Sequence, residues 1–182
     1  MLALFKRPLA AHTALVPSLI VSSALLGFIS PACADTDVSL HPGFGLIDSQ
    51  PLNEIWLNPG FYSRHFQNDI GLDNDNFGFG AEYRFSTVNS VTIGRFLNSD
   101  RQYSDYAGLY YQPFSIGPLR LGAVVGGFNG YPHMLNGGWF LAAIPMISME
   151  YQRVGLNIAF VPSYKDRLYG AISFQVKVNV WK

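Results

Sequence analysis

The chain has 182 residues and balanced charges, 12 Lys plus Arg against 12 Asp plus Glu, so its formal net charge is zero. A length of about 100 to 200 residues suits one domain, and a neutral chain has no electrostatic basis for binding nucleic acid. Charged residues make up 13% of the chain and aromatic residues 15%. Because soluble domains carry roughly 25% charged residues, we do not expect a soluble cytosolic enzyme.

Residues 1–34 predict an export signal. Lys6 and Arg7 form a basic start, an apolar stretch covers residues 14–29, and Ala32-Cys33-Ala34 has the small-residue pattern of a cleavage site. Cleavage there would leave a mature chain without cysteine, which excludes disulfides and thiol chemistry. An uncleaved membrane anchor and a lipid attached to Cys33 are the two alternatives.

The next segment, residues 35–53, is rich in Gly, Pro, Ser and Asp and predicts an irregular lead-in. From residue 59 onward, apolar residues alternate with small or polar ones. Aromatic residues alternate with Gly, Glu and Arg over residues 77–85, and aliphatic residues alternate with polar ones over residues 172–180. A period of two predicts strands with one apolar face.

Eight such segments follow one another, at residues 58–68, 77–87, 90–98, 104–114, 118–129, 138–151, 153–162 and 168–181. The length of each segment is close to the roughly 9 to 11 residues that a tilted strand needs to cross a bilayer. Short and long connections alternate between the segments, as in outer-membrane barrels. Because lipid tolerates no open strand edge, we predict an all-β fold, an eight-stranded antiparallel β-barrel over residues 54–182. The predicted location is the outer membrane of a Gram-negative type of cell, with the barrel as a monomer. A soluble exported barrel, with its apolar rows inside, is the alternative.

Two motifs in these segments carry candidate functional residues. Pro145 lies in Ile144-Pro145-Met146 and Pro162 in Val161-Pro162-Ser163. Proline lacks a backbone N–H and so removes a donor from the ladder, although prolines also occur at bulges and strand ends for structural reasons alone. The second motif is Phe96-Leu97-Asn98-Ser99, followed by Tyr106-Ala107-Gly108. Polar residues directly after a strand can also be an ordinary loop cap.

With these motifs in this order, residues 59–182 resemble the lipid A palmitoyltransferase (PagP) family. Members of that family are eight-stranded outer-membrane barrels that move an acyl chain from a phospholipid to lipid A. The resemblance implies that Pro145 and Pro162 mark a lateral gate through which lipid enters the lumen. It also implies that Ser99 is the functional serine, whereas Asn98 stands where the family has an aspartate.

The resemblance further implies that His65 is the catalytic histidine, near the outer end of the first strand. Its distance from Pro59 is one residue longer than in the family, and a one-residue slip turns a strand side chain to the opposite face unless a bulge absorbs it. His41 and His133 are the alternative histidines. Tyr110 falls where the family has the glycine that lines the floor of its acyl pocket, which implies a shorter pocket.

The resemblance therefore implies an acyltransferase that uses a glycerophospholipid as donor and lipid A or a related envelope lipid as acceptor. His65 would be the general base, and Asn98 and Ser99 would donate hydrogen bonds to the oxyanion. A non-enzymatic barrel that stabilises the envelope or presents a surface is the second hypothesis, and a lipid A deacylase or phospholipase is the third. No cofactor or metal is expected, because no nucleotide motif is present and the acidic segment 69–75 lacks the Glu that closes a calcium loop.

Overall fold

The computed structural model describes residues 43–67, 71–165 and 167–182. These residues form nine strands and one short 3-10 turn. The strands are β1 (Phe44–Leu46), β2 (Pro51–His65), β3 (Asp75–Ser86), β4 (Asn89–Leu97), β5 (Tyr103–Ile116), β6 (Leu119–Phe128), β7 (Phe140–Tyr151), β8 (Val154–Val161) and β9 (Ala171–Trp181). In the described part of the chain, no helix has the length and apolar character to span a membrane. The predicted signal and residues 35–42 of the predicted lead-in lie outside the described residues. The rest of that lead-in, residues 43–53, is not irregular throughout, because it contains β1 and the first residues of β2.

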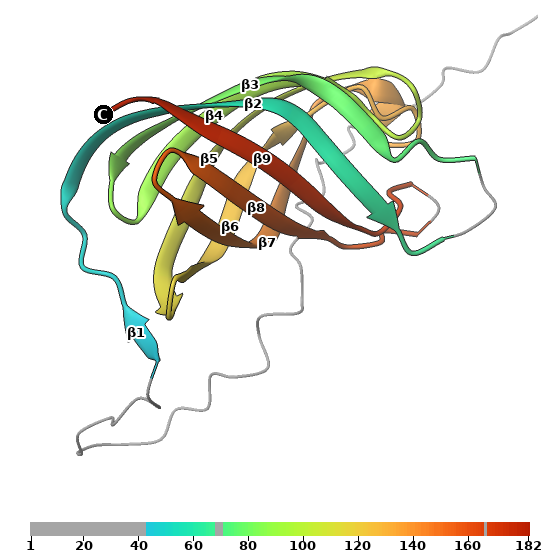
Figure 1. The fold of residues 1–182 in the computed structure, drawn as a ribbon. Helices are drawn as coiled ribbons and strands as arrows, with labels where there is room; N and C mark the ends of the chain where they lie inside the picture. The colour runs from blue at the N-terminus through green and yellow to red at the C-terminus, as the bar shows by residue number, and fades with distance from the viewer. Residues whose placement is uncertain (1–42, 68–70, 166) are drawn as a thin grey trace, which may run out of the picture.

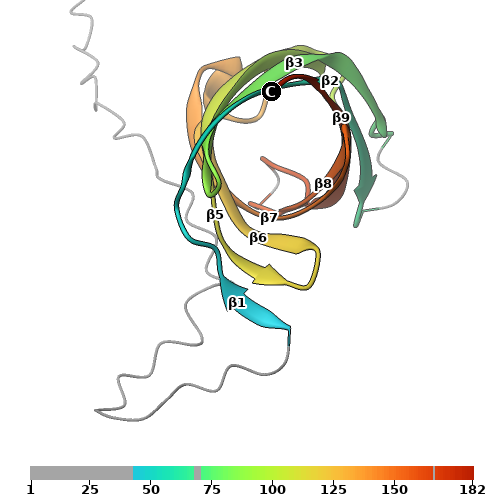
Figure 2. The ribbon, with the colours of Figure 1, turned by 60° about the vertical axis from the view of Figure 1, so that its left-hand side comes forward.

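Strands β2 to β9 close into a barrel. Each strand pairs antiparallel with the next in the chain, and β2 pairs with β9 to complete the ring (Figures 1 and 2). The predicted eight-stranded antiparallel barrel is therefore confirmed. The ninth strand, β1, lies outside the ring and pairs with the end of β5.

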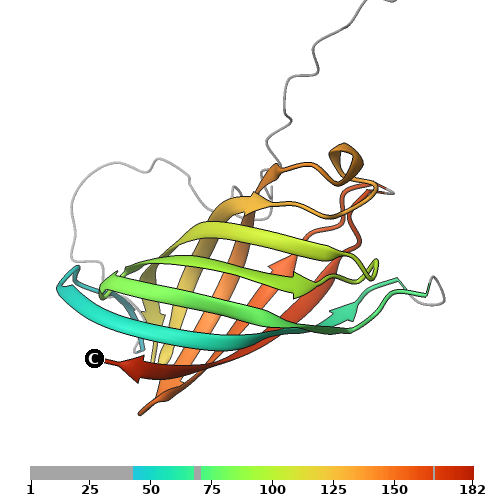
Figure 3. The same ribbon diagram turned by 90° about the horizontal axis from the view of Figure 1, so that it is seen from above.

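The two ends of the barrel differ in their connections. Short turns follow β3, β5 and β7, whereas longer connections that include residues 98–102, 129–139, 162–165 and 167–170 lie at the opposite end, where β2 ends and β3 begins (Figure 3). We call these the turn end and the loop end. The alternation of short and long connections that the sequence predicts is therefore present in the structure.

Strand β2 begins at Pro51, seven residues before the predicted start. Its pairing with β9 shifts by one residue between Leu57 and Tyr62, and Gly60 in that interval has a positive φ of 104°. The shift changes which residues face the lumen. Trp56 and Asn58 are buried before it, and Phe61, Ser63 and His65 line the lumen cavity after it. The alternation predicted from residue 59 onward starts close to this shift, so it does not reveal the first half of the strand.

The barrel wall is apolar outside, and its inner face carries buried charged residues in the half near the turn end. On β3, Phe77 and Phe79 are 72% and 64% exposed, while the alternate residues Glu82 and Arg84 are buried. On β9, Lys177 is 2% exposed and its neighbours Val176 and Val178 face outward. Soluble barrels have the opposite arrangement, because their apolar rows pack inside.

Candidate functional site

The lumen is divided into an ionic half and an apolar half. The ionic half lies at the turn end, where Lys177 Nζ is 2.7 Å from Glu82 Oε2 and 3.0 Å from Glu150 Oε1. Arg84 donates two hydrogen bonds to Glu150 across the barrel, from β3 to β7. The Trp56 ring lies 4.8 Å from Lys177 Nζ and 5.4 Å from Arg84 Cζ. Ion pairs between opposite walls therefore fill this half of the lumen.

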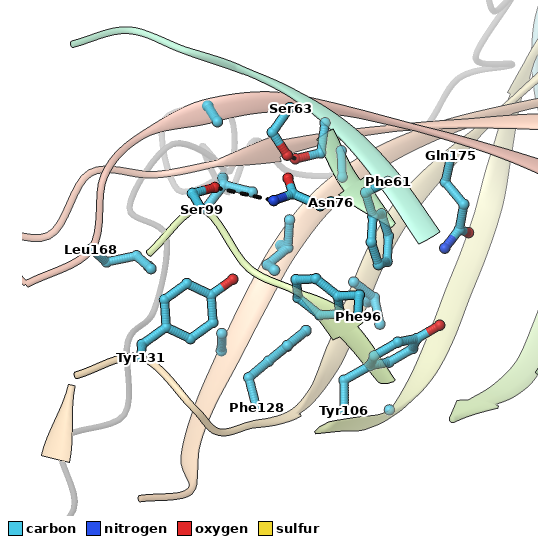
Figure 4. Close-up of a pocket in the computed structure, with 18 of the residues that line it drawn as sticks. Phe61, Ser63, Asn76, Phe96, Ser99, Tyr106, Phe128, Tyr131, Leu168 and Gln175 are labelled. Atoms are coloured by element: carbon cyan, nitrogen blue, oxygen red, sulfur yellow. Dashed lines mark hydrogen bonds between the residues drawn. The ribbon is translucent and has the colours of Figure 1, made fainter. Parts of the chain in front are cut away.

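The apolar half is a cavity of about 110 Å³ at the loop end (Figure 4). Aromatic side chains from β2, β4, β5 and β6 line it and pack edge to face or stacked. The ring of Phe61 lies 5.0 Å from that of Phe96 and 5.8 Å from that of Tyr106, and Tyr106 stacks on Phe128 at 6.1 Å. Such a lining excludes water and suits an apolar ligand.

Tyr110 lines the deep end of this cavity. It is 5% exposed and packs against Val124 and Met146. The polar residues Thr92, Asn157 and Gln175 also line the cavity, and Asn157 donates to Gln175 Oε1 at 2.9 Å. The cavity therefore ends on a floor of one tyrosine and several polar side chains, with the ionic half beyond it.

Polar side chains lie among the residues that line the mouth of the cavity. His65 Nδ1 is 2.9 Å from Asn74 Oδ1, and Asn76 Nδ2 donates to Ser99 Oγ at 3.5 Å. His65, Asn76, Ser99 and Asp100 all line the cavity. The structure thus places His65 and Ser99 at one cavity, although no hydrogen bond joins these two side chains among the described residues.

Asn98 has a different place from the one that the resemblance implies. It is fully buried and does not line the cavity. Its Oδ1 accepts from the backbone N–H groups of Asp100 and Gln102 at 3.0 Å each, and its Nδ2 donates to Ser104 Oγ and to the Gly130 carbonyl at 2.9 Å each. Asn98 therefore fixes the loop that carries Ser99. An aspartate could not make the two donated bonds, which gives a physical reason for asparagine at this position.

The ladder between β7 and β8 is incomplete. Pairing runs from Tyr151 opposite Val154 to Met146 opposite Ala159 and then stops. Pro145 is the next residue of β7, and Pro162 directly follows β8. Both strands stay paired to their other neighbours over this stretch. The barrel wall at the loop end thus lacks hydrogen bonds between β7 and β8 at the position of the two prolines.

The cavity reaches this unpaired part of the wall. Ala142 and Ile144 of β7 and Val161 and Pro162 beside β8 line it, whereas Pro145 itself does not. Side chains from two loops pack against this stretch: Met134 and Leu168, which are 5% and 7% exposed, form a cluster with Phe140 and Ala142. Close packing of side chains, rather than a strand ladder, covers the wall here.

Tyr131 is a further cavity residue, from the loop between β6 and β7. Burial raises the pKa of its hydroxyl well above the usual value, and the nearby Asp100 carboxylate acts in the same direction. The hydroxyl is therefore neutral at physiological pH and available as a hydrogen-bond donor.

Sequence reasoning missed several of these residues. Phe61, Phe96 and Phe128 line the cavity. A signal for them is that the residues facing the lumen change along a strand from polar at the turn end to aromatic at the loop end. On β5, for example, Gln112 lies toward the turn end and Tyr106 toward the loop end. The loop residues Met134 and Leu168 carry no periodic signal. Their role appears only when the loops are placed over the barrel.

No group of three or more His, Cys, Asp or Glu side chains that could hold a metal ion occurs among residues 43–67, 71–165 and 167–182. In comparisons with known proteins, no family model matches the chain and no curated protein is significantly similar to it.

Proposed function

We propose that this protein is an outer-membrane barrel that transfers an acyl chain from a glycerophospholipid to lipid A or a related envelope lipid. The observation that carries the proposal is the apolar cavity at the loop end, which has polar side chains at its mouth and an unpaired wall beside it. A cavity of this kind suits one acyl chain of a lipid that enters from the side of the barrel.

The membrane location is supported by the distribution of side chains. Outward residues in the middle of the strands are large and apolar, such as Ile93 and Val125, which are 65% and 51% exposed. Exposed apolar area on this scale is costly in water and favourable in lipid. The buried ion pairs satisfy the charges that the lumen holds. The export signal predicted from residues 1–34 agrees with this location.

In the proposed reaction, the donor lipid enters between β7 and β8, beside Pro145 and Pro162, and places one acyl chain in the cavity. Its ester carbonyl then lies at the mouth, near His65 and Ser99. His65 takes the proton from an acceptor hydroxyl, whose oxygen attacks the ester carbon. When the intermediate collapses, the carbon–oxygen bond to glycerol breaks, and the glycerol oxygen receives the proton from His65.

The oxyanion of this step needs hydrogen-bond donors at the mouth. The Ser99 hydroxyl lies there and accepts from Asn76 Nδ2, so its own hydrogen is available to the oxyanion. The Nδ2 hydrogens of Asn76 are bonded to the Leu97 carbonyl and Ser99 Oγ. Those of Asn98 are bonded to Ser104 and Gly130. Asn98 is therefore a positioning residue in this proposal. His65 and Ser99 are the residues that would touch the reacting atoms.

Mass spectrometry of lipid A and phospholipids tests the activity. Cells that lack their own enzyme of this kind would express the wild-type chain, His65→Asn, Ser99→Ala or the matched control Ser49→Ala, which changes an exposed residue at the turn end. We expect one added acyl chain on lipid A with the wild type and the control, and its loss with the two site variants. An added chain that persists in both His65→Asn and Ser99→Ala would refute this site.

A non-enzymatic barrel is the second candidate function. It is favoured by the absence of a hydrogen bond between His65 and Ser99 among the described residues and by the tyrosine at the cavity floor. Unchanged lipids in cells that contain a folded, heat-modifiable barrel would support it. Release of a fatty acid from lipid A or phospholipid, without a new acylated product, would instead indicate hydrolysis, with water as acceptor.

A further inference from the structure

A patch of four apolar residues lies at the turn end of the barrel, where β1 pairs with the last residues of β5. Phe44 stands opposite Ile116, and Leu46 stands opposite Phe114. The rings of Phe44 and Phe114 stack at 5.9 Å. We call these four residues the apolar quartet. Their exposed fractions are 38% for Phe44, 68% for Leu46, 38% for Phe114 and 45% for Ile116.

The quartet lies on the outer face of the barrel wall. Before residue 112, the outward residues of β5 pair with outward residues of β6, such as Leu109 with Val125. The register then shifts by one residue between Tyr111 and Phe114, so that Phe114 pairs with Leu121. Because a bulge of one residue reverses the alternation, Phe114 shares the outer face with Leu109. The apolar outer surface of the wall therefore continues into β1.

Strand β1 occupies an edge that would otherwise be open. The ladder of β4 with β5 begins at Asn89 opposite Tyr111, so β4 provides no partner beyond that point. The Ile47 N–H donates to the Pro113 carbonyl at 2.7 Å, and the Gly117 N–H donates to the Gly43 carbonyl at 2.9 Å. These bonds hold β1 beside β5, where the two strands extend from the rim of the barrel (Figure 2).

The segment after β1 is fixed in turn to the β3–β4 turn. The Gln50 N–H donates to Thr87 Oγ1 at 2.9 Å, and the Thr87 N–H donates to the Gln50 carbonyl at 2.9 Å. Hydrogen bonds to β5 and to the β3–β4 turn therefore hold the quartet at a fixed position along the barrel axis.

We infer that the apolar quartet is a membrane-interface anchor, seated at the boundary between headgroups and acyl chains of the leaflet at the turn end. This inference rests on the proposed membrane location. The occupant is lipid because the quartet continues the outer wall that would face lipid, while the other face of the same two strands carries the small residues Gly45 and Ser115. Aromatic residues at the turn-end termini of β7 and β9, Tyr151 and Trp181, are also exposed, as expected for a belt at this level.

Depth-dependent fluorescence quenching tests the anchor. In the full chain with Cys33→Ser, a single cysteine would be placed by Leu46→Cys, Val125→Cys or Ser49→Cys and labelled with an environment-sensitive dye. Each labelled protein would be folded into phosphatidylcholine vesicles and exposed to lipid-attached quenchers or to iodide. We expect the Leu46 label at a depth of about 5 to 10 Å below the headgroup boundary, as for other interfacial elements. Val125 is the wall control and Ser49 the aqueous control.

Three other outcomes would overturn the inference in distinguishable ways. Iodide quenching of the Leu46 label as strong as that of the Ser49 label, with the Val125 label still in lipid, would refute the anchor and leave the membrane barrel intact. Shielding of the Leu46 label from both quenchers would show that protein covers the quartet, such as a second copy of the chain. Iodide quenching of the Val125 label would refute the membrane location and the anchor together.

Discussion

Replacing Lys177 by methionine tests the ionic half of the lumen. Lys177 is 2% exposed, and its ammonium contacts Glu82 at 2.7 Å, Glu150 at 3.0 Å and the Trp56 ring at 4.8 Å. The cluster holds three carboxylates, of Glu54, Glu82 and Glu150, and three largely buried cations, of Arg84, Arg120 and Lys177. The exposed Lys182 lies at its edge, 3.8 Å from Glu54. Removal of one cation therefore leaves one buried negative charge without compensation.

Breaking a buried ion pair by removing one partner typically costs about 3 to 5 kcal/mol, and we expect a loss of this size in the free energy of unfolding. The assay is urea unfolding of the barrel in lipid vesicles, followed by tryptophan fluorescence and by the heat-modifiable shift on gels. Lys182→Met is the matched control, because Lys182 is 49% exposed and lies 3.8 Å from Glu54. An exposed pair of this kind contributes at most about 1 kcal/mol.

A second variant separates charge from packing. Lys177→Met combined with Glu82→Gln removes one charge of each sign, so we expect it to be more stable than Lys177→Met alone. If Lys177→Met costs no more than Lys182→Met, or if the double variant is less stable than the single one, the lumen is not held by this charge balance.

Three further substitutions have expected outcomes. Asn98→Asp should lower the free energy of unfolding by about 1 to 3 kcal/mol, because the carboxylate leaves the Gly130 carbonyl without its donor. We expect faster proteolysis within residues 98–102, and an unchanged rate of proteolysis would contradict the positioning role of Asn98. Tyr110→Gly should deepen the cavity, so that mass spectrometry finds longer acyl chains on the product than with Tyr110→Phe; identical chain lengths would show that Tyr110 does not set the floor. Gly94→Ala should cost about 1 to 3 kcal/mol in urea unfolding, since its added methyl would lie 2.6 Å from the Phe79 carbonyl and from the Tyr106 ring and hydroxyl. Wild-type stability would contradict this close packing.

The strands of the barrel were predictable because one face of each is apolar along its length. Six of the eight predicted segments need only small changes at their ends to match β3 to β8. Strand β2 was harder, since the shift near Gly60 reverses the alternation within a single strand. Short-range patterns cannot show where such a shift falls, because it depends on pairing with β9, more than 100 residues away in the chain.

The same shift decides the position of His65. Its spacing from Pro59 left its face open on the sequence alone, and the change of register turns its side chain toward the cavity. Asn98 shows the opposite case. Its neighbour Ser99 lies at the cavity, but its own four hydrogen bonds join it to its own loop, to Ser104 of β5 and to Gly130 of a more distant loop. Motif spacing selected His65, Asn98 and Ser99 as candidates, whereas the partners of each side chain are visible only in the fold.

Because the ladder between β7 and β8 is incomplete, backbone hydrogen bonds run around the whole barrel only at its turn end. There, every strand is bonded to two neighbours and ion pairs join opposite walls. At the loop end, β7 and β8 are not paired, and side-chain packing alone holds these two strands together. Separating β7 from β8 at this end would cost local packing but no ladder hydrogen bonds, so we expect the loop end to open at a lower free energy than the turn end. The circumference of the barrel is thus held by backbone pairing and ion pairs at one end, and partly by side-chain packing at the other.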